Sequence, residues 1–227
     1  MSSAMFDPYS RKGRILAAAL GCAASKRWAE VTLLDIAEGA NLSIGELREE
    51  FGSKADIIAG LLRAIDDEVL KRLPKRTEGQ EKRDRLFDII MTRFDVLGPH
   101  KAALKSLYAA GAADLALAIP YLSSQHWMLQ AAGIGTDGAT GAMRVAGLGL
   151  AYASVFRTWL EDDDPGLAKT MAGLDRRLRR GERTLGSIEH LNIAVSRFGE
   201  ALGELARGLT RGRPKPSPPP GPDAGQV

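Results

Sequence analysis

Residues 32–54 read TLLDIAEGANLSIGELREEFGSK and have the pattern of two short helices joined by a tight turn. Thr32 and Ser43 stand where helix N-caps belong, because their hydroxyl oxygens can accept hydrogen bonds from backbone amides of the first turn. Gly39 and Asn41 tolerate the left-handed backbone at which the first helix must stop. Helix, tight turn and helix make a helix-turn-helix, whose second helix is the one offered to the DNA major groove.

The sequence on both sides extends this pattern. Asp35 follows Thr32 by three residues and is an imperfect partner for a capping box. Upstream, apolar residues at helical spacing predict a first helix from about residue 10 to residue 26. Downstream, Ser53 can cap a long helix to about residue 73, which would join an N-terminal head to a larger body. Further helices are predicted over residues 81–97, 99–110, 113–133, 141–161, 166–180 and 187–209.

The motif and its flanks carry a family resemblance. Segments 11–20, 32–51 and 52–58 resemble the N-terminal DNA-binding domain of the TetR-type transcriptional regulators. The matching residues are Ile15, Leu16, Ala19, Thr32, Ile36, Ala37, Ala40, Leu42, Ser43, Gly45, Leu47, Phe51, Ser53 and Lys54. The resemblance implies an all-α, TetR-like fold: an N-terminal three-helix helix-turn-helix head on a helical-bundle body for ligand binding and dimerisation. The expected parts are a flexible arm (1–9), the head (10–52), the body (53–209) and a disordered Pro-rich tail (210–227).

Composition agrees with a helical globular protein. Hydrophobic residues make up 44% of the 227 residues and charged residues 26%, which suffices for a sizeable core. The net charge of +3 permits contact with nucleic acid or an anionic membrane without demanding it. Cys22 is the single cysteine, so an intramolecular disulfide is excluded. No secretory segment opens the chain and no apolar run approaches the ~18 residues of a membrane span, so we expect a cytoplasmic protein.

The candidate DNA-binding residues lie on and around the second helix of the motif. They are Arg11, Arg14, Thr32, Ser43, Ile44, Gly45, Glu46, Arg48 and Lys54. Arginine and lysine would hold phosphates, and Glu46 could accept from cytosine N4. Residues 43–51 nevertheless hold three Glu against one Arg, a net charge of −2 that opposes the approach of a polyanion.

The body concentrates aromatic and sulfur-containing side chains. Two interpretations are open: ordinary core packing, or the wall of an apolar ligand cavity between helices. The candidate ligand-binding residues are Tyr108, Tyr121, Trp127, Met128, Tyr152, Phe156 and Trp159. Pro120, inside the helix expected over residues 113–133, predicts a kink that would favour a cavity. The ligand would be a small apolar or lipid-like effector.

A second resemblance concerns residues 142–182, which look like the C-terminal region of the lipid-binding accessory protein of ubiquinone (coenzyme Q) biosynthesis. The shared features are an acidic turn ending at Pro165, followed by Thr170, Leu174 and Arg177 or Leu178 at helical spacing. That family is similar to TetR regulators in fold, holds an isoprenoid-like lipid and meets membranes through a terminal amphipathic helix. The resemblance implies peripheral membrane contact through residues 187–209; a packing or dimer helix is the alternative.

No pattern points to catalysis, a cofactor or a metal. His100, His126 and His190 are scattered, without the spacing of metal ligands. The triplet 162–164 is either a cation site or a solvated acidic turn before a helix, and the glycine-rich stretch 133–141 lacks a phosphate-binding pattern. We therefore expect no enzyme.

Two functional hypotheses remain. The leading one is a ligand-responsive transcriptional repressor, a homodimer that binds a palindromic operator DNA with half-sites about one helical turn apart. The alternative is a lipid-binding accessory protein that uses the same fold without binding DNA.

Overall fold

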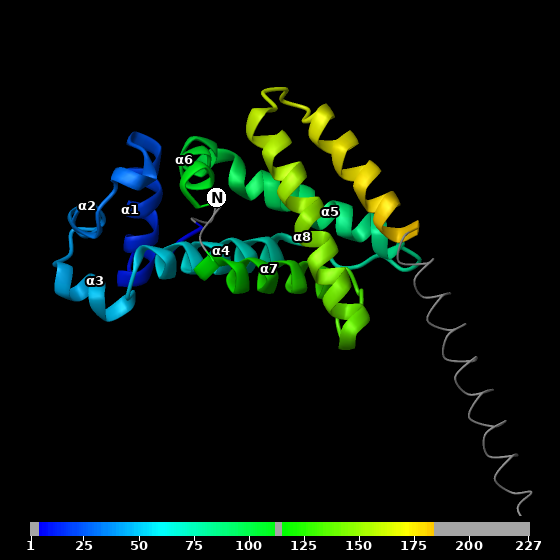
Figure 1. Cartoon of the computed structure of the whole chain (residues 1–227), viewed down its shortest axis with the longest axis horizontal. Coiled ribbons are helices and arrows are strands. Elements are labelled where there is room, and N and C mark those ends of the chain that lie inside the picture. Colours follow the sequence, from blue (N-terminus) through cyan, green and yellow to red (C-terminus); the bar gives the residue numbers. More distant parts are fainter. Residues whose placement is uncertain (1–4, 112–114, 184–227) are drawn as a thin grey trace, which may run out of the picture. The chain divides into compact units, whose positions relative to one another are not determined.

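The computed structural model describes residues 5–111 and 115–183, and within these ranges it contains helices and no strand (Figure 1). The contacts reported below lie in one compact unit, Met1–Glu182. The α-helices are α1 (Arg11–Ser25), α2 (Leu33–Gly39), α3 (Ile44–Glu50), α4 (Lys54–Arg72), α5 (Lys82–Leu97), α6 (Lys101–Gly111), α7 (Ala118–Ala131) and α8 (Gly138–Glu161). Residues 168–183 are also helical. The expected all-α fold is confirmed.

The head consists of α1, α2 and α3, which contact one another around a small apolar core. Ile15 and Ala19 of α1 are fully buried, as is Ile36 of α2, and Leu47 of α3 is 1% exposed. Asn41 adopts the left-handed region, with φ 52°, in the turn between α2 and α3. The turn expected between the two helices of the motif is therefore present, with Asn41 rather than Gly39 taking the left-handed conformation.

Helix α4 leads from the head into the body. Its N-cap Ser53 accepts a hydrogen bond from the amide of Asp56, and Lys71 and Arg72 end it, where cations favour the helix dipole. Ile57, Leu61, Ile65 and Val69 recur every four residues and are buried. With this buried stripe, α4 contacts α1 of the head as well as α5 and α7 of the body.

The body packs α5, α7 and α8 around aliphatic and aromatic side chains. Ile89, Ile90 and Phe94 of α5 lie inward, and Val155 and Trp159 of α8 are likewise buried. These residues repeat at helical spacing, so each helix buries one apolar stripe.

The prediction of a helix kinked at Pro120 is wrong. Residues 115–117 form a single 3₁₀ turn and α7 begins at Ala118, so Pro120 is its third residue. In the first turn of a helix the backbone amide has no intrahelical acceptor, so proline removes no hydrogen bond there. Residues 112–114, which the expected helix included, lie outside the described residues.

The glycine-rich stretch separates α7 from α8. Gly133 has φ 73° and follows α7, and the amide of Ile134 donates to the carbonyl of Leu129 at 2.9 Å, as in a helix ended by a left-handed residue. The stretch is thus a helix stop followed by the start of α8.

The acidic turn at residues 162–164 caps the helix that follows it. The carboxylate of Asp162 accepts from the amide and the hydroxyl of Thr170, at 3.0 and 2.7 Å, and Asp164 accepts from the amide of Ala168 at 3.0 Å. Hydrogen bonding from the Thr170 hydroxyl lowers the pKa of Asp162. Asp162 is buried, so the turn is not simply solvated, and within the described ranges no group of His, Cys, Asp and Glu could hold a metal.

Two expectations fall outside these ranges: the helix over residues 187–209 and the tail from residue 210 lie beyond the described residues. Within the described part of the chain, every helix is too short or too polar to cross a bilayer.

Candidate functional site

The outward face of the helix-turn-helix is formed by the start and middle of α3. Leu47 anchors this helix inward, and Phe51, just after its end, is also buried. Ile44 is 49% exposed, and Gly45 and Arg48 are exposed beside it. These three residues from the predicted DNA-binding set therefore share the accessible surface of α3.

Ser43 and Glu46 lie at the surface and are hydrogen-bonded to each other. The Ser43 hydroxyl accepts from the amide of Glu46, and the Glu46 carboxylate accepts from both the amide and the hydroxyl of Ser43, each at 2.9 Å. The hydrogen bond from the Ser43 amide is the main cause of the lowered pKa of Glu46. Because the carboxylate is bent back to the start of α3, reading cytosine would require Glu46 to leave this capping box.

Arg11 of α1 lies beside two glutamates of α3. Its guanidinium is 2.6 Å from the carboxylate of Glu49 and 3.5 Å from that of Glu46. Adding this cation to the −2 of residues 43–51 leaves −1 on the surface that α3 presents. The pairing reduces the negative charge that opposes DNA binding. It also means that Arg11 binds a glutamate in this structure and is not free to bind a phosphate.

Lys54 is held inside the head. Its ammonium donates to the carbonyls of Trp28 and Val31, both at 2.6 Å, and lies 4.6 Å from the centroid of the Trp28 ring. Burial lowers the pKa of Lys54. The amine therefore fastens the start of α4 to the segment that precedes α2, a role that the sequence did not suggest.

Two further predicted DNA-binding residues also make contacts within the head. Thr32 forms a complete capping box with Asp35, although aspartate there looked like an imperfect partner. The carboxylate of Asp35 also accepts from Lys26 at 2.7 Å, and that bond is the main cause of its lowered pKa. Arg14 donates to the carbonyl of Ala40 over a long 3.4 Å.

Five of the seven candidate ligand-binding residues form one connected ring cluster with Phe94. Ring centroids are 5.2 Å apart for Phe94 and Trp159, 5.8 Å for Phe94 and Tyr152, and 5.5 Å for Phe156 and Trp159. The cluster comprises Phe94, Tyr108, Tyr121, Tyr152, Phe156 and Trp159. Met128 of α7 is also buried. Trp127 is 52% exposed and, among the described rings, contacts only that of His126, in a T-shaped arrangement.

A buried polar network lies against this ring cluster and was missed in the sequence. Arg93, 2% exposed, pairs with Asp66 of α4 and donates to the Tyr152 hydroxyl at 3.0 Å. Ser124 of α7 donates to the same Asp66 carboxylate at 2.7 Å. Arg93 follows Ile89 by four residues, so its position on the inward stripe of α5 was the available signal.

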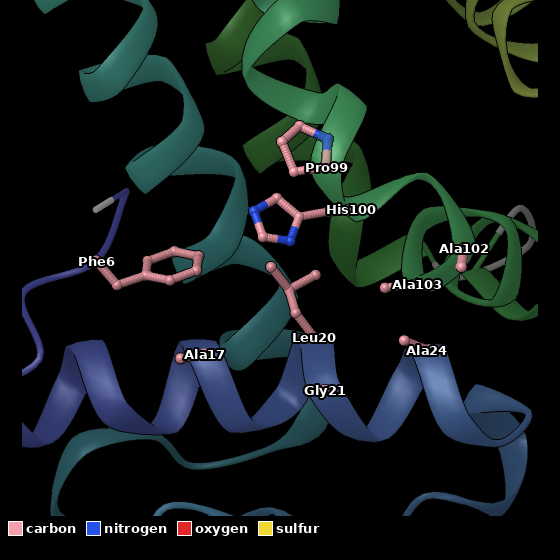
Figure 2. A pocket seen from close by; sticks show the side chains of 9 residues that line it. All are labelled: Phe6, Ala17, Leu20, Gly21, Ala24, Pro99, His100, Ala102 and Ala103. Carbon is pink, nitrogen blue, oxygen red and sulfur yellow. The ribbon is translucent and has the colours of Figure 1, made fainter. Parts of the chain in front are cut away.

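A groove separates α1 of the head from the turn between α5 and α6. Two adjoining cavities of about 890 and 300 Å³ make it up, and Phe6, Ala17, Pro99 and His100 line both. Figure 2 shows Phe6, Leu20 and the His100 imidazole directed into the space above α1. None of these residues was among the predicted ligand-binding residues.

Comparison with known proteins gives structural neighbours only: no protein-family description matches the chain, and no curated protein is similar in sequence. A TetR transcriptional regulator from Nitrosomonas europaea ATCC 19718 is 21% identical with a TM-score of 0.60, covering 76% of this chain and 98% of its own. A TetR transcriptional regulator from Rhodococcus sp. RHA1 is 20% identical with a TM-score of 0.58, covering 75% of this chain and 94% of its own. A tetR-family transcriptional regulator from Streptomyces coelicolor is 17% identical with a TM-score of 0.56, covering 88% of this chain and 97% of its own.

Nothing in these comparisons supports the resemblance to the lipid-binding accessory protein. The neighbours are transcriptional regulators, and the similarity runs over nearly their whole length. The chain therefore has the fold of TetR-type transcriptional regulators.

Proposed function

We propose that the protein is a DNA-binding transcriptional regulator that works without catalysis. The observation that carries the proposal is the helix-turn-helix, in which α2 and α3 both begin with a complete capping box and pack on α1. Such a motif, at the N-terminus of a chain with a TetR-like fold, is the geometry used to place a helix in the major groove.

The exposed residues of α3 define how this head would meet DNA. Arg48 supplies a cation and a fork of donors for phosphate or guanine, and Ile44 offers an apolar surface to a thymine methyl group. Arg11 can exchange the Glu49 carboxylate for a phosphate oxygen without moving α1, because both groups lie at the surface. Base contacts would thus come from α3, and phosphate contacts from the start of α1.

An apolar face on α8 supports a homodimer. Met143 and Leu150 are 47% and 77% exposed, and Ala146 and Gly147 between them are exposed as well. These positions follow the i, i+3, i+4, i+7 spacing of a helix-packing stripe. Two copies that bury this face against each other would present two heads to a palindromic operator.

The body supports control by a ligand. An apolar effector among the aromatic rings of α5, α6, α7 and α8 would act on the Asp66–Arg93 pair, which connects α4 to the body. Since α4 also carries the head, a change there would alter the spacing of the two heads. Release of the operator on effector binding would make the protein a repressor, working in the cytoplasm.

The proposal is tested by selecting genomic fragments with purified protein and measuring affinity at two salt concentrations. Sequence-selective binding with a steep salt dependence is expected, because phosphate contacts release counterions. Arg48→Ala should weaken specific binding about tenfold. Arg63→Ala, which removes an exposed arginine from α4, is the matched control and should leave it unchanged. Binding without sequence preference would refute the proposal.

A further inference from the structure

We propose that the groove between α1 and the α5–α6 turn is a second ligand site, for an uncharged apolar molecule that carries one hydroxyl or carbonyl group. It is separate from the aromatic cluster of the body, since the two share no residue. Its combined cavities, about 890 and 300 Å³, are large enough for a small organic ligand.

The floor of the groove is one face of α1. Ala17, Leu20, Gly21 and Ala24 follow helical spacing, and three of the four have small side chains or none. A Cβ atom added at Gly21 would meet nothing within 4 Å, so the floor lies open at this point. The apolar floor favours a hydrophobic ligand over a polar one.

One wall is formed by the segment before α1, which is fastened in place. The carbonyl of Asp7 accepts from the amide and the hydroxyl of Ser10, at 3.3 and 3.1 Å. This carbonyl sits so close to α1 that a Cβ at Gly13 would be only 2.0 Å from it. Phe6, which immediately precedes Asp7, is thereby held over the groove and is partly buried against the core.

The opposite wall supplies a polar group without a net charge. The His100 imidazole points into the groove beside Pro99 (Figure 2). Burial lowers the pKa of His100, so that the ring is neutral at pH 7 and can donate one hydrogen bond and accept another. A hydroxyl or carbonyl on the ligand would match it.

The rim is electrically balanced. Arg14, Arg72 and Asp95 line the larger cavity, and Arg72 is paired with Glu68 at 2.7 Å. Two cations and two carboxylates give no net charge to attract an ion. Because these charges cancel, the rim gives no net attraction to an ion, and the apolar floor favours a neutral ligand, which loses less hydration on entering the groove.

Occupation of the groove would bridge head and body, because its floor belongs to α1 and its far wall to the end of α5 and start of α6. These elements are already in contact through α1 and α6. A ligand there would fix the head against the body. An effect of the ligand on DNA affinity rests on the proposed function, whereas binding of the ligand to the groove does not.

The test uses Nile red, a neutral apolar dye with a carbonyl group, whose fluorescence rises on leaving water. The full chain should bind it saturably, and 1-decanol should displace it at concentrations where decanoate does not. Gly21→Leu fills the open floor and should weaken dye binding about tenfold. Ala109→Leu, which adds the same side chain to the exposed surface of α6, should not.

His100→Phe keeps a planar ring but removes the hydrogen-bonding group, and should weaken dye binding about fivefold. Leucine is a better helix former than glycine, so Gly21→Leu should melt no lower than wild type. Dye affinity unchanged in both Gly21→Leu and His100→Phe, or displacement by decanoate and not by decanol, would overturn the proposal. The dye assay contains no DNA, so its result does not depend on the proposed function. A protein that binds the dye as expected but shows no sequence-selective DNA binding would refute the proposed function and leave the groove proposal standing.

Discussion

The head and the body hold their helices by different means. In the head, Ser10, Thr32 and Ser43 close the first turns of α1, α2 and α3 with their own side chains, as Ser53 does for α4. In the body, the N-cap residues of α5, α7 and α8 make no side-chain cap hydrogen bond; they are Glu81, Leu117 and Asp137. The head helices and α4 therefore start with local side-chain bonds, whereas α5, α7 and α8 depend on packing between distant segments. The helix over residues 168–183, capped by Asp164, is the exception in the body.

This difference suits a molecule in which the body changes and the head moves as a unit. Helices that depend on mutual packing can shift together when a ligand enters, whereas capped helices keep their own ends. The two regions can be told apart by substitutions that remove either a long-range contact or a local one.

The largest effect is expected in the body, from Arg93→Met. This change leaves the Asp66 carboxylate, whose side chain is only 12% exposed, without its ionic partner. The loss should cost about 3 kcal/mol in the free energy of unfolding. Urea unfolding followed by helical circular dichroism measures it. Arg63→Met, on the exposed side of α4, should change stability by less than about 0.5 kcal/mol.

A double variant sharpens the interpretation of Arg93→Met. Replacing Asp66 by Asn in the same chain removes the stranded charge and keeps an acceptor for Ser124, so much of the lost stability should return. A double variant no more stable than Arg93→Met alone would show that the loss comes from packing and not from the ion pair.

The next effect concerns the junction at which α4 leaves the head. Lys54→Met removes the donor shared by the carbonyls of Trp28 and Val31, and should cost about 1–3 kcal/mol. Lys71→Met, on the exposed end of the same helix, is the control. Equal stability of the two variants in urea would contradict the role given to Lys54.

A smaller effect compares one cap in each region. Ser43→Ala should destabilise by about 1 kcal/mol, because α3 loses its capping box. Asp137→Ala, at the start of α8, should cost less than about 0.5 kcal/mol, since this side chain makes no cap hydrogen bond. If Asp137→Ala proved the costlier change in thermal unfolding, the contrast between the regions would fail.

The smallest effect concerns the dependence of stability on acid pH, to which two carboxylates with lowered pKa values contribute. Asp35 in the head and Asp162 in the body titrate below their unfolded value near 3.8. Their contribution is therefore complete above that value and is lost as the pH falls through the folded pKa. Stability should fall below about pH 4, and Asp35→Asn and Asp162→Asn should each flatten the pH profile of the melting temperature. An unchanged profile in both variants would contradict these bonds.

The same contrast explains what the sequence could predict. Caps depend on residues three positions apart, so the spacing of Thr32 and Ser43 from the residues they cap was legible in the sequence. The Asp66–Arg93 pair joins residues 27 positions apart on different helices, and no local pattern names such a partner. The boundary of α7 was missed for a related reason, because proline is equally compatible with the first turn of a helix and with a kink.

The residues of the candidate sites also divide into those that a local pattern predicts and those that depend on long-range contacts. The sequence identified the residues that α3 exposes, Ile44, Gly45 and Arg48, because their positions follow from one short helix. It did not reveal that Lys54 and Glu46 are engaged within the head, since those bonds depend on how the turns close. The groove is lined by Phe6 and His100, which lie far apart in the sequence. A periodic pattern within one helix cannot predict that two such distant residues are neighbours.

The ion pair between Arg11 and Glu49 also has an evolutionary consequence. Both side chains lie at the surface, so neither is constrained by the packing of the core. A single-base change in the Glu49 codon yields glutamine or lysine, and either would remove the 2.6 Å partner of Arg11 and make the face of α3 less negative. Only the longer 3.5 Å contact with Glu46 would then remain. The attraction of this head for a polyanion can therefore be retuned in one mutational step, by selection acting on a fold that stays the same.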